Sequence, residues 1–94
     1  MNKKIIVISA VWCPYCLILK KYLKKLKEEN NELIVNTYDY DFDEDEIKKY
    51  NVNEILPVII VEDNDVEVSR LIGEKTYEEI MDFLKENNAI WRKE

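Results

Sequence analysis

The spacing of hydrophobic residues changes abruptly near residue 13. Before that point, residues 5–8 form an unbroken run of β-branched side chains, which is typical of a strand that is covered on both faces inside a sheet. After it, hydrophobic side chains recur every three or four residues with lysines between them, which predicts an amphipathic helix over residues 13 to about 29. A central strand therefore leads directly into a helix.

The middle of the chain predicts a strand and then a short acidic helix. The strand is expected over residues 33–38 and the helix over residues 43–50, with acidic side chains in its first turn, where the helix dipole favours them. The acidic residues from Asp39 onward also resemble a calcium-binding loop, but Glu44 and Tyr50 occupy the positions where such a loop needs Gly and Glu. We interpret the cluster as the solvated start of the helix.

The C-terminal half predicts a hairpin followed by a final helix. The hydrophobic run at residues 58–61 and the alternating residues 66–71 are joined by an Asp-Asn-Asp turn, which is typical of two antiparallel strands. Thr76 and Glu79 form a capping-box pattern in front of a helix expected over about 76–87. The complete predicted order is β-α-β-α-β-β-α.

The composition fits one globular domain covering residues 1–94. Hydrophobic residues make up 47% of the chain and charged residues 36%, with one Gly and two Pro, which lies outside the range of disordered chains. The formal net charge of −6 disfavours phosphate backbones, so we expect no nucleic-acid partner. We expect a monomer, with Trp91 as a packing anchor near the C-terminus.

The sequence favours a cytoplasmic protein with no membrane association. Lys3 and Lys4 precede an apolar run over residues 5–12, as in a secretory signal, but the run is short and leads into Trp12 instead of a small-residue cleavage site. No stretch approaches the roughly 20 apolar residues of a membrane span. The two cysteines are too close together to build the framework of a disulfide-stapled secreted domain.

Cys13 and Cys16 are the chemical centre of the sequence. A cysteine that a strand delivers onto a helix N-terminus faces unpaired backbone N–H groups, which stabilise a thiolate there. Pro14 suits the first helical position, so Cys13 is expected to be the helix cap, with its sulfur accepting hydrogen bonds from the N–H groups of Tyr15 or Cys16. We therefore assign Cys13 as the nucleophile.

Cys16 lies one helical turn inside and is assigned as the resolving cysteine. An i to i+3 pair falls within the usual Cα separation of a disulfide, so Cys16 can attack a mixed disulfide on Cys13 and release the reduced substrate. The sequence thus predicts a thiol–disulfide oxidoreductase that works as a disulfide reductase. An oxidant that introduces disulfides is disfavoured, because that role belongs to oxidising compartments. The alternative from another class is a metal or iron–sulfur binding module that uses the same two thiolates at a dimer interface, although the chain has no other Cys and no His.

Residues 13–16, Cys-Pro-Tyr-Cys, resemble the active-site motif of glutaredoxins, whereas Trp12 before them resembles thioredoxins. The resemblance covers nearly the whole chain and implies an α/β thioredoxin-like fold with a glutaredoxin-type core, in which helices flank a central mixed four-stranded sheet. It also implies a cis bond before Pro57, and backbone groups of Leu56 that bind an extended substrate. The residues that it places at the substrate site are Trp12, Pro14, Tyr15, Leu56 and Pro57.

The same resemblance implies the partners of the reaction. They are disulfide-containing proteins as substrates, and glutathione or a thioredoxin-reductase-like flavoprotein as the electron donor, with no bound cofactor. The protein would maintain cell redox homeostasis or pass electrons to a reductase, since Leu56-Pro57-Val58 is similar to redoxins that serve ribonucleotide reductase. Glutaredoxins usually hold glutathione with a Gly-Gly pair, but here Glu74 follows Gly73 and its charge opposes a carboxylate.

Overall fold

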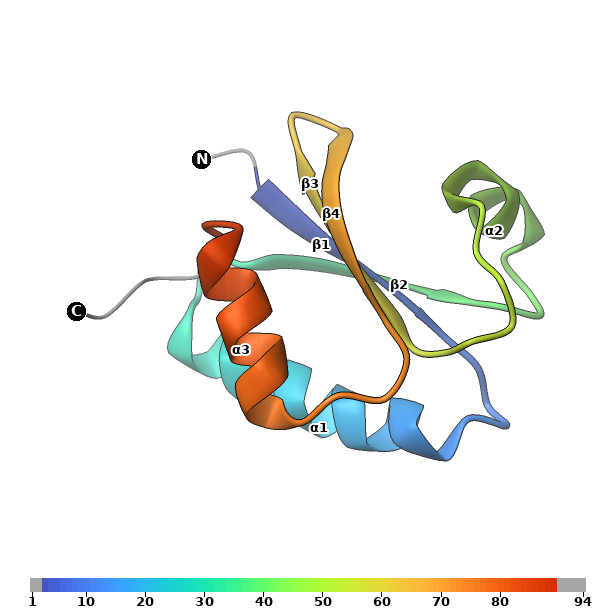
Figure 1. The fold of residues 1–94 in the computed structure, drawn as a ribbon, viewed down its shortest axis with the longest axis horizontal. Coiled ribbons are helices and arrows are strands. Elements are labelled where there is room, and N and C mark those ends of the chain that lie inside the picture. The colour runs from blue at the N-terminus through green and yellow to red at the C-terminus, as the bar shows by residue number, and fades with distance from the viewer. Residues whose placement is uncertain (1–2, 90–94) are drawn as a thin grey trace.

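The computed structural model describes residues 3–89 of the chain (Figure 1). Within these residues the elements follow the predicted β-α-β-α-β-β-α order. They are β1 (Lys3–Ser9), α1 (Pro14–Glu29), β2 (Ile34–Asp39), α2 (Glu44–Tyr50), β3 (Val58–Asp63), β4 (Val66–Ile72) and α3 (Tyr77–Glu86). The packing anchor predicted at Trp91 lies outside the described residues.

The strands form one mixed sheet in the order β2-β1-β3-β4. β1 runs parallel to β2 and antiparallel to β3, and β3 pairs antiparallel with β4. β1 is thus an inner strand, and Ile5, Ile6, Val7 and Ile8 are each at most 1% exposed. The unbroken hydrophobic run correctly predicted a strand buried on both faces, and the predicted four-stranded mixed sheet is confirmed.

Helices cover the two faces of the sheet unequally. Figure 1 shows α1 and α3 on one side and the short α2 on the other. Because side chains alternate along a strand, Ile5 and Val7 pack into the core beneath α1 and α3, whereas Ile6 and Ile8 face the α2 side. Both cysteines belong to the core on the α2 side.

The two longer helices bury the faces that their periodicity predicted. α1 buries Cys16, Leu19, Leu23 and Leu26 and leaves its lysines exposed. α3 begins at the predicted capping box: the Glu79 N–H donates to Thr76 Oγ1 at 3.1 Å, and the Thr76 N–H donates to Glu79 Oε1 at 3.2 Å. Two otherwise unpaired donors at the start of α3 are thereby satisfied.

A buried carboxylate on the α2 side was not predicted from the sequence. Glu62 is only 3% exposed, accepts a hydrogen bond from the Tyr50 hydroxyl, and has its Oε1 3.7 Å from Lys4 Nζ. Arg70 Nη2 donates to the backbone oxygen of Tyr50 at 2.7 Å, and Arg70 Nε donates to Glu67 Oε2 at 2.6 Å. These contacts fasten the C-terminal end of α2 to β3 and β4.

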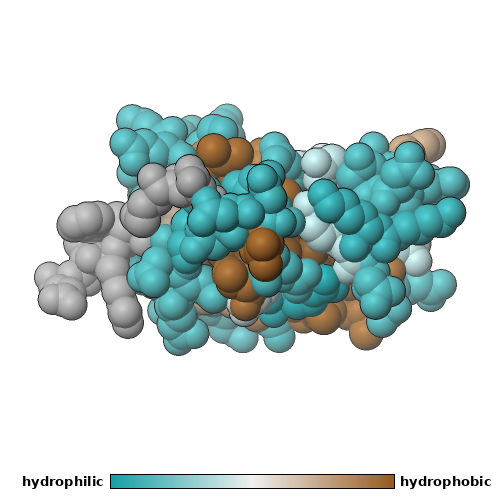
Figure 2. Space-filling model, turned by 90° about the horizontal axis from the view of Figure 1, so that it is seen from above, coloured by the Kyte–Doolittle hydropathy of each residue, from teal (hydrophilic) through white to brown (hydrophobic). Residues whose placement is uncertain are grey.

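Hydrophilic side chains cover most of the face shown in Figure 2, and hydrophobic side chains form separate patches among them. Several exposed hydrophobic residues surround the start of α1: Val11, Trp12, Tyr15, Leu17 and Ile18. None of the helices within residues 3–89 is both long enough and apolar enough to cross a membrane.

Candidate active site

The end of β1 delivers Cys13 to the start of α1. The Tyr40 N–H donates to the Ser9 oxygen at 2.8 Å, and the Cys13 N–H donates to the Ala10 oxygen at 3.2 Å, which fixes the intervening turn. Cys13 has extended backbone angles (φ −98°, ψ 107°) and is the N-cap residue, while Pro14 occupies the first helical position. The strand-to-helix placement predicted from the sequence is therefore present.

Cys13 and Cys16 are joined by a disulfide bond. Their Cα atoms lie 5.3 Å apart, within the usual range for disulfides. The prediction that the Cys13 sulfur caps α1 is wrong for this form, because the sulfur is bonded to Cys16 and makes no capping hydrogen bond. The Cys16 N–H donates instead to the backbone oxygen of Cys13 at 3.2 Å.

The two cysteines differ little in burial. Cys13 is 4% exposed and Cys16 is 2% exposed, so burial does not distinguish the two cysteines in the disulfide form. Both belong, together with Leu56, to the core on the α2 side. What separates them is position along the backbone: Cys13 precedes the first turn of α1, and Cys16 lies within it.

Trp12 is held beside the disulfide by the loop that follows β2. Its Nε1 donates to Asp41 Oδ2 at 2.7 Å, and its ring meets the Tyr40 ring edge to face, with centroids 6.3 Å apart. The side chain is nevertheless 53% exposed. The indole next to Cys13 is therefore both held in place and exposed, and its contact with a substrate chain stays a prediction.

The acidic segment after β2 is a structured loop as well as a helix start. Asp39 Oδ1 accepts the N–H groups of Asp41 at 2.8 Å and Phe42 at 3.2 Å, and Asp43 Oδ2 accepts the N–H of Asp39 at 2.7 Å. The predicted helix start is present, with Glu44, Asp45 and Glu46 in the first turn of α2. Asp39 and Asp43 have an additional role, because short Asp side chains bond to backbone N–H groups a few residues away. Within residues 3–89, no group of three or more Cys, Asp or Glu side chains is placed to hold a metal ion.

The Leu56-Pro57 peptide bond is cis. Pro57 directly precedes Val58, which pairs with Ile8 near the end of β1, so the bond lies at the same edge of the sheet as the disulfide. The Pro57 oxygen accepts the Gly73 N–H at 2.8 Å. This bond ties the proline segment to the connection between β4 and α3.

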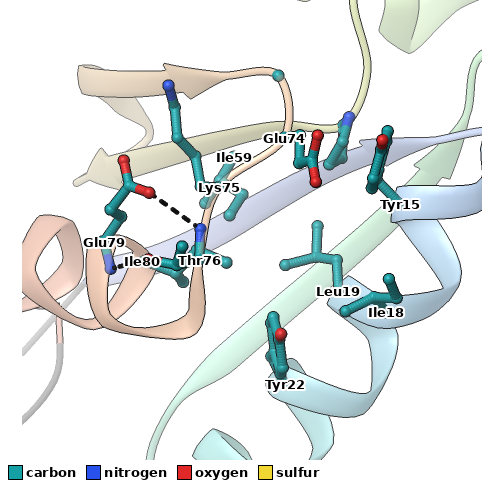
Figure 3. A pocket seen from close by; sticks show the side chains of 12 residues that line it. Tyr15, Ile18, Leu19, Tyr22, Ile59, Glu74, Lys75, Thr76, Glu79 and Ile80 are labelled. Carbon is teal, nitrogen blue, oxygen red and sulfur yellow. Dashed lines mark hydrogen bonds between the residues drawn. The ribbon is translucent and has the colours of Figure 1, made fainter.

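A pocket of about 310 Å³ lies between α1 and the connection from β4 to α3 (Figure 3). Tyr15 and Pro57 line it at the end near the disulfide, and Glu74 lies on its rim. The Tyr15 hydroxyl donates to Glu74, and this bond raises the pKa of Tyr15. Pro14 is exposed at the start of α1, outside the residues that line the pocket.

The structure thus brings the predicted site residues to one edge of the sheet, and it adds two partners that the sequence did not reveal. Asp41 acts on Trp12 across 29 residues of sequence, and Glu74 bonds to Tyr15. The sequence showed only that Asp41 lies in the segment after a strand and that Glu74 replaces the second glycine of the glutaredoxin pattern. Neither pattern identifies the side chain that it contacts.

Several solved structures are similar to this chain. Trxlp from Edwardsiella tarda EIB202 is 26% identical with a TM-score of 0.80, and the match covers 88% of this chain and 82% of that chain. The Schistosoma mansoni thioredoxin pre-protein is 25% identical with a TM-score of 0.78 (90% and 78% covered). Mitochondrial thioredoxin 3 from Saccharomyces cerevisiae, 21% identical with a TM-score of 0.80 (90% and 78% covered), shares the fold.

Comparison of the sequence with known families and proteins gives one family match. No curated protein sequence matches the chain significantly. The sequence profile of the family described as Thioredoxin matches residues 1–86. These matches do not single out the glutaredoxin branch that the Cys-Pro-Tyr-Cys motif resembles. With its α/β fold and its disulfide between Cys13 and Cys16, the chain belongs to the thioredoxin family.

Proposed function

We propose that this protein is a dithiol disulfide reductase. The observation that carries the proposal is the disulfide between Cys13 and Cys16 at the start of α1. A redox pair in this position can exchange with a disulfide of another chain. The surrounding exposed side chains, Trp12 and Tyr15, offer that chain a surface to contact.

The proposed cycle begins with the reduced protein. The Cys13 thiolate attacks one sulfur of a substrate disulfide, a new bond joins Cys13 to that sulfur, and the other substrate sulfur leaves as a thiolate. The Cys16 thiolate then attacks the Cys13 sulfur, which releases the second substrate thiolate and forms the disulfide seen here. The substrate gains two electrons and the protein loses two.

The start of α1 favours Cys13 as the attacking thiol. In the reduced protein the Cys13 sulfur is no longer bonded to Cys16, and Cys13 lies at the N-cap of α1, where the helix dipole is positive. This position lowers the pKa of a cysteine and raises the fraction of thiolate at neutral pH. Cys16, inside the first turn, then serves as the resolving thiol.

The cycle requires partners on both sides. We propose disulfide-containing proteins as substrates and, as electron donor, glutathione or a thioredoxin-reductase-like flavoprotein. No bound organic cofactor is required, because the two sulfurs carry the electrons. We further propose that the protein maintains redox homeostasis or passes electrons to a reductase. Either role requires a reducing compartment, and we propose the cytoplasm.

A redox titration tests the proposal. The protein is equilibrated in graded redox buffers, its free thiols are trapped by alkylation, and the oxidised and reduced forms are counted by mass. Reversible gain and loss of two thiols is the expected result. A midpoint of about −270 mV favours thioredoxin-like use of a flavoprotein reductase, and one of about −200 to −230 mV favours glutaredoxin-like use of glutathione. A pair that does not cycle would overturn the function.

A further inference from the structure

The pocket between α1 and the connection from β4 to α3 is lined at one end by Tyr15, in the first turn of α1. Tyr15 follows Cys13 by two positions on α1, and Pro57 lines the same pocket. A substrate chain whose cysteine is bonded to Cys13 therefore has neighbouring side chains within reach of the pocket. The volume of about 310 Å³ suits one long side chain.

The floor of the pocket is apolar. Leu19, Ile59 and Ile80 line it and are each at most 3% exposed, and Figure 3 shows side chains of α1 and of the first turn of α3 on its two sides. An apolar floor binds the methylene groups of a side chain. Selectivity among substrate side chains therefore depends on the polar atoms at the rim of the pocket.

The charges on the rim are not balanced at the end near the disulfide. Glu79 Oε1 accepts the Thr76 N–H at 3.2 Å, and the positive charge of Lys75 lowers the pKa of Glu79 further. Glu74 accepts a hydrogen bond from the Tyr15 hydroxyl, which is neutral. Within residues 3–89, no ion pair joins Glu74 to a lysine or an arginine. In Figure 3 the Glu74 carboxylate lies near Tyr15, whereas the Lys75 amine points away from it.

We propose that this pocket binds a lysine or arginine side chain of the disulfide-containing polypeptide, and that Glu74 is the residue that selects for its charge. The inference rests on the function proposed above and names its substrate class. The methylene stem lies on the apolar floor, and the cationic head forms a charge-assisted hydrogen bond with Glu74. A ligand that carries carboxylates, such as glutathione, is repelled by the same residue.

The test uses oxidised peptides that are identical except for the residue next to the cysteine, which is Arg, norleucine or Glu. Dithiothreitol is supplied as the reductant that recycles the full-length protein, its direct reduction of each peptide is subtracted, and kcat/KM is measured at low ionic strength. We expect kcat/KM to be about fivefold higher for Arg than for norleucine, and lower again for Glu, as an exposed charge pair allows. High salt should reduce the difference.

Two variants separate the role of Glu74 from general surface charge. Glu74→Gln keeps an acceptor for Tyr15 but removes the charge, so the preference for Arg over norleucine should disappear. Glu78→Gln removes a charge from an exposed position of α3 that does not line the pocket, so the preference should remain as in the wild type. Circular dichroism verifies that both variants are folded.

Hydroxyethyl disulfide distinguishes failure of this inference from failure of the proposed function. If the wild-type protein reduces neither this neutral disulfide nor any peptide, the reductase function itself is wrong. If it reduces the neutral disulfide but shows no preference for Arg, or if the preference survives in Glu74→Gln, the reductase stands and the selective role of the pocket is overturned.

Discussion

Cys13 and Cys16 have similar burial in the disulfide, so their chemical difference must come from their places on α1. Cys13 precedes the first turn and Cys16 lies within it. We therefore expect Cys16→Ser to accumulate a mixed disulfide with a substrate, because nothing resolves the bond on Cys13. Cys13→Ser should accumulate none.

Mass spectrometry without reductant, after mixing each variant with a protein disulfide, measures the trapped species. The double variant serves as the blank. Accumulation in Cys13→Ser that equals or exceeds that in Cys16→Ser would reverse the assignment of nucleophile and resolving thiol. In Cys13→Ser, turnover should fall to the rate of uncatalysed exchange.

Trp12 depends on Asp41 for its position beside the disulfide. The indole N–H donates to Asp41 Oδ2 at 2.7 Å. Asp41→Ala removes this acceptor, so we expect the exchange of the Trp12 indole hydrogen with solvent to rise about fivefold, as loss of one exposed charged hydrogen bond implies. NMR of the indole N–H signals measures the rate, with Trp12→Phe to assign the signal.

Asp45→Ala is the matched control, because Asp45 is an exposed acid on the neighbouring α2. Its substitution removes the same charge but should leave the exchange rate of Trp12 unchanged. Equal exchange in wild type and Asp41→Ala would show that Asp41 does not hold the indole in solution. Activity toward protein disulfides should fall in Asp41→Ala only if Trp12 contacts the substrate.

At the scale of elements, α3 carries one side of the substrate pocket and begins at the capping box. Thr76→Ala leaves the N–H of Glu79 without its acceptor, so the free energy of unfolding should fall by about 1 kcal/mol. Thr76→Ser keeps the hydroxyl and should retain most of the stability. Urea unfolding of the three proteins measures the difference, and equal midpoints for Ala and Ser would contradict the role of the cap.

Hydrophobic spacing predicted the elements because spacing is a local property. The run at residues 5–8 and the repeat that ends at Leu26 determine a strand and a helix whatever the rest of the chain does. Contacts between distant segments were not predictable in this way. The bond from Trp12 to Asp41 and the burial of Glu62 depend on which loop and which strand lie alongside, and no local pattern contains that information.

At the scale of the molecule, the two faces of the sheet differ in polarity. The core beneath α1 and α3 is made of hydrophobic side chains. On the other face, the buried carboxylate of Glu62 lies between the Tyr50 hydroxyl and the Lys4 amine. A buried carboxylate needs such partners, because burial without them is costly. Folding therefore depends on protonation at Tyr50 and Lys4.

Alkaline unfolding tests this dependence. Burial, and to a smaller extent the bond to Glu62, raises the pKa of Tyr50 from 10.0 to about 12. Between these values the unfolded chain has lost the Tyr50 proton and the folded protein has kept it, so the folded state binds more protons and stability falls as pH rises. Below pH 10 both states are protonated and the contribution of Tyr50 is fully present. The pKa of Lys4, raised mainly by its hydrogen bond with Asp65, acts in the same direction.

We expect the free energy of unfolding in urea to fall less steeply between pH 10 and 12 in Tyr50→Phe than in the wild type. The slopes are compared instead of the absolute values, because the variant also leaves Glu62 with one hydrogen bond fewer and is less stable at every pH. Tyrosinate absorbance of the folded proteins gives an independent reading: the wild type should show one tyrosine with a midpoint near 12 that the variant lacks. Equal slopes and equal titrations would mean that Tyr50 is not buried against Glu62 in solution.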